Sequence, residues 1–442
     1  MFGSIRRVGF RVTGADGIAR YGLGGNILIF RPTVSHAWRG IFILACLTIA
    51  PDARAGGFGI RAQSAEGFGA AIAGVAAGNA LSFSYWNPAV LANVDRFQVE
   101  GVSNVIFPAI SLDPAASNTV DIGKGALVPA MYMAMPLNSR MTLGMSITSP
   151  YGLATQAPTN WAGQIYGRKS EIFSINANPM LSYRVNDVLS VGVGLQVQYF
   201  KTKLTQAVDV VPFAPDAMLK ADGVGVGFNL GMQLKPWAGG TIGLGYRSAI
   251  SHDLDGHLTT PLGRTSAAAG LTTPALVSLG VRQELNERYR VMGTVEWTNW
   301  SRLGTVPVYD GVSGGVLTTL PLRYRDGWLF SVGGEYDFSQ KVTARAGVGY
   351  EIAPMNDMTR DVRLPEPNQV ILSAGLSYRY SERTTLDLAI TQSLGLGNGA
   401  VTIASGDPRY LGLPFSATSD LNVTIVSAGL KMKFDSLPFG IR

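Results

Sequence analysis

From Arg96 onward, apolar residues alternate with small polar residues, and fourteen separate segments keep this period of two. A period of two places successive side chains on opposite faces of a β-strand, so each segment predicts a strand with one apolar face. The mean length of about 10 to 12 residues is what a tilted strand needs to cross a bilayer. The segments lie near residues 96–106, 127–136, 140–152, 171–185, 188–203, 223–234, 240–250, 274–285, 289–300, 327–337, 341–350, 369–380, 384–394 and 424–434.

The connections between these segments are alternately short and long. Long connections of roughly 18 to 29 residues are typical of the outer loops of outer-membrane barrels, and tight turns of their periplasmic side. An even number of strands closes the sheet and leaves no unpaired edge in lipid. The sequence therefore predicts an all-β membrane protein, in which residues 96–434 form a 14-stranded antiparallel transmembrane β-barrel. The short connections are "LNS" (137–139), "ND" (186–187), "KPWAG" (235–239), "NER" (286–288), "FSQ" (338–340) and "SER" (381–383).

The composition agrees with a membrane barrel and excludes a nucleic-acid-binding protein. Charged residues are 15% of the chain, against about 25% in a typical soluble domain. No stretch contains the roughly 20 apolar residues of a membrane helix. The net charge of +6 comes mainly from residues 1–55, which hold seven arginines and two aspartates, and the remainder carries only +1. We therefore expect no nucleic-acid partner.

Residues 1–55 are interpreted as a leader. His36–Ala55 has the pattern of a secretory signal peptide, with a basic start, a short apolar core and an A-x-A cleavage site at residues 53–55. The mature chain is expected to begin near Gly56. Residues 1–35 are unusual for a signal peptide, and we interpret them as an over-extended gene start.

The only cysteine, Cys46, lies inside the apolar core of this leader. A lipidated cysteine is the alternative interpretation, but the apolar run continues past Cys46 and the A-x-A site is the better cleavage signal. The mature protein is then expected to contain no disulfide and no cysteine metal site.

The alternation also assigns faces within the strands. Arg345, Glu335, Asp337, Arg379 and Lys433 have the phase opposite to the apolar residues of their strands. A basic residue on the lipid face costs about 2–4 kcal/mol near mid-bilayer. We therefore expect these five side chains to face the lumen and to pair with one another or with a plug.

Residues 56–95 precede the first strand, are rich in glycine and alanine, and are not strand-like. A barrel of this size is wide enough to hold a small plug, and small side chains suit close packing against its wall. We therefore expect residues 56–95 to form an N-terminal hatch. Asn87-Pro88-Ala89 would end it, because Pro88 favours an extended Asn87 and the amide can bond to nearby backbone.

Several stretches together resemble the FadL family of outer-membrane transporters, which carry long-chain fatty acids and, in some members, aromatic hydrocarbons. The hatch stretch "GGFGIRAQSAEGFGAAIAG" is followed by "NPAVL" and then by "VPAMYMAMPLNSRMTLGMSITSPYGLAT", which resembles the second and third strands of the family. "LGYRSAISHDLDGHL", "VEWTNWS" and the closing Phe434 also fit, so the resemblance spans nearly the whole mature chain. The last eight residues, 435–442, follow Phe434 as a C-terminal extension.

The resemblance implies a monomeric uptake channel for hydrophobic molecules in the outer membrane of a Gram-negative bacterium. Ligand would bind inside the barrel and leave sideways into the bilayer through a gap at a bend in the third strand, gated by the hatch. By position, Phe58 and Asn87-Pro88-Ala89 would belong to the gate. Membership implies outer-membrane lipids, lipopolysaccharide and the barrel-assembly machinery as partners, and neither enzymatic activity nor a cofactor.

The bend itself is assigned to Ser149, Pro150, Tyr151 and Gly152. Pro150 has no N–H to donate to a strand ladder and Gly152 has no side chain, so both weaken pairing where a gap in the wall is needed.

The ligand-binding residues and the ligand stay open. Gln206 and Pro307 stand where fatty-acid members carry basic residues, and the third and fourth outer loops, about 204–222 and 251–273, are short for such members. A long-chain fatty acid and a neutral hydrocarbon are therefore both retained. An open porin or a structural, adhesive barrel is the alternative function, although a 40-residue hatch opposes an unobstructed pore.

Other chemistry has weaker support. "HDLDGH" (252–257) offers two histidines and two aspartates, but its spacing matches no known metal site, and we expect it in an outer loop. A Ser-His-Asp hydrolase would have to take its histidine from this loop, and the chain has no G-x-S-x-G motif. We expect no metal and no catalytic residue.

Overall fold

A computed structural model describes residues 21–23, 26–28 and 57–435, and the chain divides into residues 1–52 and 53–442. In the first unit, β1 (Tyr21–Leu23) pairs antiparallel with β2 (Asn26–Leu28). The expected signal peptide, Cys46 and residues 436–442 lie outside the described residues. No helix among the described residues has the length and hydrophobicity to cross a membrane.

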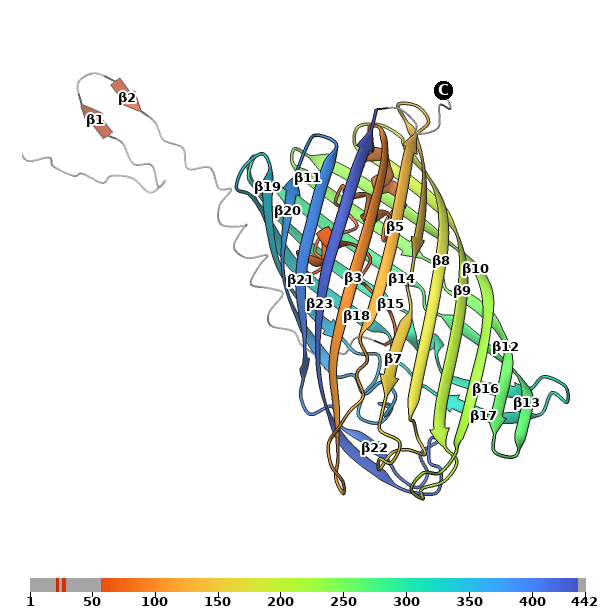
Figure 1. Cartoon of the computed structure of the whole chain (residues 1–442). Coiled ribbons are helices and arrows are strands. Elements are labelled where there is room, and N and C mark those ends of the chain that lie inside the picture. Colours follow the sequence, from red (N-terminus) through yellow and green to blue (C-terminus); the bar gives the residue numbers. More distant parts are fainter. Residues whose placement is uncertain (1–20, 24–25, 29–56, 436–442) are drawn as a thin grey trace, which may run out of the picture. The chain divides into compact units, whose positions relative to one another are not determined.

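The second unit is a closed antiparallel β-barrel with fourteen wall strands, which confirms the predicted fold class (Figure 1). Five of these wall strands consist of two pieces each: β6 with β7, β11 with β12, β13 with β14, β15 with β16, and β17 with β18. The last strand, β23, pairs with the first, β3, from the pair Ala417 and Pro114 to the pair Phe434 and Phe97. This pairing closes the barrel, so neither strand is left as an open edge. The strands are β3 (Phe97–Pro114), β4 (Val120–Asp121), β5 (Ala126–Pro136), β6 (Met141–Thr148), β7 (Gly152–Gln156), β8 (Lys169–Arg184), β9 (Leu189–Ala207), β10 (Asp216–Trp237), β11 (Gly240–Arg247), β12 (Ile250–Thr260), β13 (Gly263–Thr273), β14 (Leu276–Glu284), β15 (Tyr289–Thr298), β16 (Thr305–Asp310), β17 (Val316–Pro321), β18 (Gly327–Asp337), β19 (Val342–Ile352), β20 (Asn368–Arg379), β21 (Thr384–Leu396), β22 (Val401–Ile403) and β23 (Phe415–Phe434).

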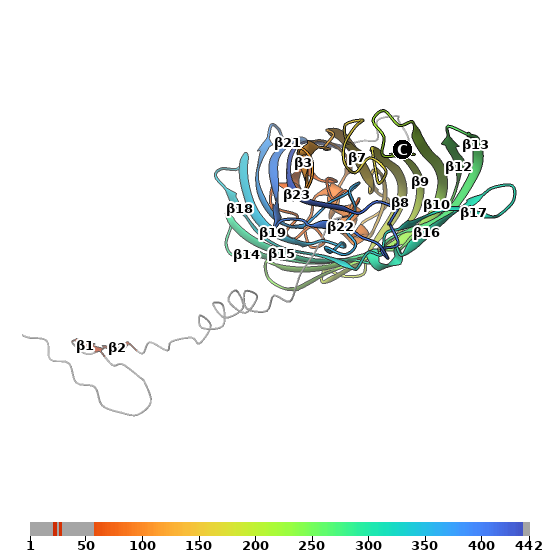
Figure 2. The ribbon, with the colours of Figure 1, turned by 90° about the horizontal axis from the view of Figure 1, so that it is seen from below.

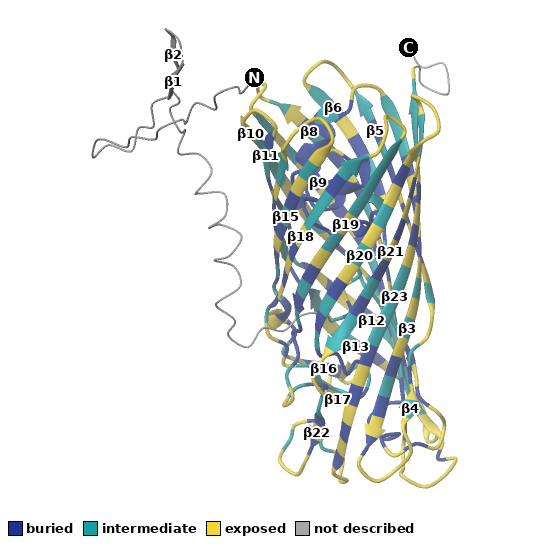
Figure 3. Cartoon of the chain, turned by 90° about the vertical axis from the view of Figure 1, so that its left-hand side faces the viewer, coloured by how far each residue is buried: buried dark blue, intermediate teal, exposed yellow. Residues whose placement is uncertain are grey.

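Buried and exposed residues alternate along the wall strands, as Figure 3 shows by its colour bands. On β20, Leu372 and Leu376 are exposed, whereas the residues that flank them, Ile371 and Ser377, are buried. Because exposed aliphatic side chains on the outer surface of a barrel contact lipid, the alternation separates a lipid face from a lumen face.

The strands extend further outward than the sequence predicts. Residues 251–273, expected as an outer loop, form most of the hairpin β12–β13, and most of 204–222 belongs to β9 and β10. This expectation was wrong because strand pairing continues beyond the bilayer. There both faces can be polar, so the apolar alternation that identified the strands fades while the backbone ladder persists.

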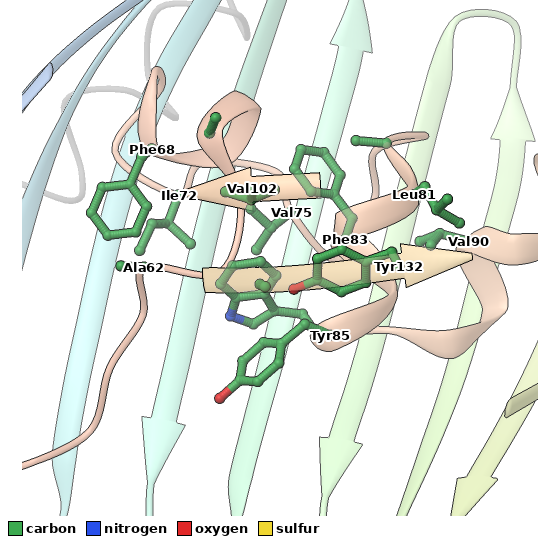
Figure 4. Packing of buried hydrophobic residues seen from close by; sticks show 14 of the residues in the cluster. Ala62, Phe68, Ile72, Val75, Leu81, Phe83, Tyr85, Val90, Val102 and Tyr132 are labelled. Carbon is green, nitrogen blue, oxygen red and sulfur yellow. The ribbon is translucent and has the colours of Figure 1, made fainter. Parts of the chain in front are cut away.

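Residues 57–95 lie inside the barrel and form the hatch (Figure 2). They contain α2 (Ala65–Phe68) and the 3₁₀ helices η2 (Leu81–Tyr85) and η3 (Pro88–Asn93); a further 3₁₀ helix, η4 (Trp300–Arg302), lies outside the hatch. Phe68, Ile72 and Phe83 pack with the wall residues Val102 and Tyr132 (Figure 4). The small residues of hatch and wall allow close contact: a Cβ on Gly243 would lie 1.8 Å from the Ala76 carbonyl oxygen.

Charged groups of the lumen wall hold the hatch in place. Glu66 of α2 forms ion pairs with Lys431, which lies 3.0 Å from Asp387, and with Arg345 at 3.5 Å. Arg345 also contacts Glu335 at 2.6 Å. We call these five residues the ion cluster.

Of the other charged residues predicted to face the lumen, Asp337 and Lys433 lie near an opposite charge and Arg379 does not. Asp337 pairs with Arg290 at 2.6 Å, and Lys433 lies 3.6 Å from Asp95 at the end of the hatch. Arg379 is exposed at the end of β20 and enters no ion pair within residues 57–435, so the pairing expected for it was wrong. Its strand ends there, and water solvates the charge.

Candidate transport site

The wall is interrupted at residues 149–151, between β6 and β7. β6 pairs with β5 and β8, but β7 pairs only with β8 among the named strands, apart from one isolated bridge from Thr155 to Gly123. Pro150 has no N–H, and the backbone N–H and carbonyl of Tyr151 are both bonded to the Ser174 hydroxyl, at 2.9 and 2.8 Å. We call Ser149–Gly152 the wall break.

The first residues of the hatch fill the wall break by strand-like pairing. The Ile60 N–H donates to the Pro150 carbonyl at 2.8 Å, and the Gly152 N–H donates to the Phe58 carbonyl at 2.9 Å. The Gln63 amide donates to the Ser149 carbonyl at 2.9 Å. The hatch therefore satisfies backbone groups that the neighbouring strand leaves without partners.

Aromatic side chains surround Phe58, which is 5% exposed. Its ring centroid lies 5.0 Å from that of Trp300, 5.9 Å from Tyr151 and 6.2 Å from Phe200, and all three contacts are edge-on. Gly57, with a φ of +85°, packs so closely on Trp300 that a Cβ there would lie 2.8 Å from the indole. This aromatic cluster encloses the side chain of Phe58.

A carboxylate in the loop 353–367 fixes the start of the hatch. The Gly57 N–H donates to Glu366 Oε2 at 2.7 Å. Burial raises the pKa of the Glu366 carboxyl well above its usual range, and nearby Glu351 adds to this shift. Arg61 then bonds to Glu296 at 2.6 Å and contacts Glu351.

Asn87-Pro88-Ala89 lies at the other end of the hatch. Asn87 is extended, with φ −143° and ψ 103°, and Pro88 begins η3. The Asn87 amide donates to the carbonyls of Ala76 and Met232 at 2.7 and 2.9 Å, and its oxygen accepts from the Ala89 N–H at 3.0 Å. One buried side chain thus joins two parts of the hatch to β10.

Two cavities lie beside Phe58. The outer cavity, of about 120 Å³, is lined by the Phe58 ring and by aliphatic side chains of β9, β10, β12, β13 and β16. The wall cavity, of about 380 Å³, begins at Gly57 and Gly59 and is lined further on by residues that face the membrane. Leu153 and Ile172 line both cavities, so the segment around Phe58 lies between them.

Charged side chains also reach the largely apolar outer cavity, and one of them is Arg363. The Arg363 guanidinium donates to Gln206 Oε1 at 2.8 Å and to the Thr205 carbonyl at 3.1 Å, but forms no ion pair within residues 57–435. Burial lowers the pKa of Arg363 from its ordinary value because the charged form has lost water. Asp361 lines the cavity too, and its Oδ1 accepts from the Arg363 N–H at 2.8 Å.

Gln206, which stands where fatty-acid members of the family carry a basic residue, bonds to Arg363, and Arg363 itself was missed by the sequence reasoning. The two residues are 157 positions apart, and the loop that carries Arg363 has no periodic pattern. Phe58 and Tyr151 are in contact, whereas Asn87-Pro88-Ala89 contacts a different part of the wall, at Gly192 and Gly231.

The expected outer-loop position of "HDLDGH" was wrong, since residues 252–257 belong to β12. His252 is 1% exposed and packs 5.5 Å from Phe200, whereas His257 is exposed. Strand pairing with β13 imposes this alternation. No three histidine, cysteine or acidic side chains of the described residues are grouped as metal ligands would be.

Comparison with known proteins places this geometry in a family. Residues 46–434 match the family model described as outer membrane protein transport protein (OMPP1/FadL/TodX). The chain is 27% identical over 403 residues to the long-chain fatty acid transport protein of Escherichia coli O6:H1 (strain CFT073), covering 80% of this chain and 90% of that relative. It is 24% identical to outer membrane protein P1 of Haemophilus influenzae, covering 90% and 99%.

Solved structures share the fold. A Pseudomonas aeruginosa FadL homologue matches with a TM-score of 0.78 and 24% identity, covering 86% of this chain and all of that one. The Ralstonia pickettii toluene transporter TbuX matches with a TM-score of 0.62 and 17% identity, covering 83% and 98%.

Proposed function

Because the chain belongs to the OMPP1/FadL/TodX family of outer membrane transport proteins, we propose that it takes up molecules with a hydrocarbon tail and an anionic head, and releases them sideways into the bilayer. The protein is a barrel of the Gram-negative outer membrane, and its family transports hydrophobic substrates. The substrate class and the exit route are the parts proposed here.

The wall cavity carries the proposal of a lateral exit. It is lined at one end by Gly57 and Gly59 of the hatch, and at the other by Leu127, Phe173 and Ile175, whose side chains are 65%, 51% and 41% exposed on the lipid face. A ligand entering the bilayer there keeps its hydrocarbon tail out of water, which saves about 0.8 kcal/mol per CH₂. Release into the periplasm would lose that energy.

Arg363 supports an anionic head. The partly buried guanidinium bonds only to neutral oxygens within residues 57–435, and a carboxylate ligand would add the ion pair that it lacks. The relative from Escherichia coli is named for long-chain fatty acids, and TbuX for toluene; the unpaired guanidinium at the outer cavity favours the first chemistry for this chain. A long-chain fatty acid is the simplest molecule with the required head and tail.

The gate is the strand-like segment of residues 57–60. With this segment in place, two backbone hydrogen bonds close the wall break and Phe58 separates the two cavities. Movement of the segment would join the cavities and open the wall at the same point. Ser149, Pro150, Tyr151 and Gly152 are thus proposed as the exit, and Phe58 as the closing group.

A reversible cross-link tests the exit. Gly59 and Tyr151 are directly opposed in an isolated antiparallel bridge, where Cβ atoms are about 4.5–5.5 Å apart. We expect the double variant Gly59→Cys/Tyr151→Cys to lose uptake of labelled fatty acid when oxidised and to regain it on reduction. Binding to the purified oxidised protein should persist.

The matched control is Ser251→Cys/Thr272→Cys, which joins two strands that already pair and whose hydroxyls are 3.1 Å apart. Each single-cysteine variant controls for the loss of Tyr151 or Gly59. Uptake at the wild-type rate by the fully oxidised gate variant would show that the ligand leaves by another route.

A further inference from the structure

The lipid face of β8, β9 and β10 carries a shallow groove near the outer ends of these strands, which run side by side in Figure 1. The groove is lined by Glu171, Phe173, Lys201, Lys203, Met218 and Lys220. Lys203 lies directly across from Glu171 on one side and from Lys220 on the other, and Lys201 lies across from Phe173. We call Lys201, Lys203 and Lys220 the basic patch.

The charge of the basic patch is only partly neutralised within the protein, since two carboxylates, Glu171 and Asp222, face its three lysines in the strand register. Glu171 is engaged by Lys169 at 2.6 Å. Asp222 lies opposite Lys201 in the strand register, but no ion pair joins them, and none of the three lysines enters an ion pair within residues 57–435. Like charges on neighbouring cross-strand positions repel. A bound anion would remove this repulsion.

The height of the basic patch matches the boundary of the membrane. The outward residues of β9 are apolar and exposed from Val191 to Val197, and Lys201 follows ten residues after Val191. Ten residues at about 3.4 Å each, tilted by about 40°, rise about 26 Å along the membrane normal, and the apolar band of such barrels is about 25 Å tall. The lysines therefore lie where the outer leaflet's head groups begin.

From this placement we propose that the basic patch binds the phosphate groups of lipopolysaccharide, the phosphorylated glycolipid of the outer leaflet. Lysine ammonium groups bind phosphate as compact point charges. Directly below them, Phe173, Ile175 and Val224 offer 51%, 41% and 61% exposed apolar surface on which the acyl chains of the same molecule can lie. A free anion would use the lysines alone, whereas a lipid uses both parts of this surface.

The test measures binding of bisphosphorylated lipid A to the purified full-length protein by native mass spectrometry. The variant Lys201→Gln/Lys203→Gln/Lys220→Gln is expected to bind at least tenfold more weakly than wild type. Lipid A stripped of its phosphates is expected to bind wild type equally weakly, since it lacks the recognised groups.

The matched control is Arg140→Gln/Lys341→Gln/Arg379→Gln, which removes three exposed positive charges at the opposite rim. This control should bind bisphosphorylated lipid A as wild type does. The proposal would be overturned if the lysine variant bound bisphosphorylated lipid A as tightly as wild type does. It would also be overturned if wild type bound lipid A without phosphates as tightly as the bisphosphorylated form. Displacement of lipid A by the same concentration of inorganic phosphate would also overturn it, because the site would then be a plain anion site.

Discussion

The two parts of the lumen hold the hatch by different side-chain contacts. In one part, the ion cluster, the Asn87 amide and Glu100 join residues 64–95 to the wall by charges and directional hydrogen bonds. In the other, residues 57–60 form hydrogen bonds with Pro150, Gly152 and Glu366, and the side-chain contacts around Phe58 are aromatic and aliphatic. Directional polar networks are costly to break, whereas apolar contacts are non-directional and can repack. The difference agrees with the proposed gate, in which residues 57–60 move and the rest of the hatch stays fixed.

The largest effect is expected when the wall no longer depends on residues 57–60 for its closure. Replacing Ser149–Gly152 by a regular Val/Thr strand lets β7 pair with its neighbour and close the wall without the hatch. We expect uptake of labelled fatty acid into cells to fall at least tenfold, while thermal unfolding and ligand binding of the purified protein stay near wild type. Transport at the wild-type rate would contradict the lateral exit.

The fixed body should respond to loss of a charge by losing stability. Lys431→Met leaves Glu66 and Asp387 with Arg345 as their one remaining cation within residues 57–435, at 3.5 and 3.8 Å, and breaking a buried ion pair costs up to about 3–5 kcal/mol. A lower midpoint of thermal unfolding is expected. Lys433→Met is the control, since Lys433 is 41% exposed and 3.6 Å from its partner, and an exposed pair contributes about 0–1 kcal/mol. Equal effects would show that the ion cluster does not anchor the hatch.

The outer cavity should show the reverse behaviour, with affinity changed more than stability. Arg363→Gln is expected to weaken binding of a fatty acid about 10- to 100-fold, because a hydrogen bond to a charged group is worth about 1.5–3 kcal/mol. Binding of the methyl ester of the same acid should change little. Fluorescence titration of both ligands measures the ratio, with the exposed Arg302→Gln as control. An unchanged ratio would point to a neutral ligand.

The smallest expected effect concerns the joint between hatch and β10. Replacing Asn87 and Pro88 by alanine leaves the Ala76 and Met232 carbonyls without their donor, at a cost of about 1–3 kcal/mol. We expect ligand binding and uptake to change together, because a loosened hatch positions Phe58 less well. The control is Asn422→Ala, whose amide bonds to Asp420 within the wall strand β23; it should change neither, and parallel assays of both variants check this.

Sequence alone predicted most of the wall, and it named two residues of the candidate site, Phe58 and Tyr151, that the structure brings into contact. Lipid on one side and a polar lumen on the other impose an alternation of apolar and polar residues, so strands within the bilayer can be predicted from the sequence. The hairpin at 250–273 lies beyond that constraint, and its polar residues were taken for a loop. Phe58 and Tyr151 followed from position in a resembling family. Arg363, Trp300 and Glu366 meet the site only through contacts between distant segments, which no local pattern records.

If the gate opens as proposed, it must break the two backbone hydrogen bonds across the wall break. When residues 57–60 leave, the Gly152 N–H and the Pro150 carbonyl face hydrocarbon without partners, and each such group costs several kcal/mol. Since each 1.4 kcal/mol is a factor of ten in population, an empty open channel would be rare and short-lived. The barrier to antibiotics and detergents would then need no separate closing element. Without a bound ligand, the cost of the unpaired backbone groups in the wall would itself favour the closed state.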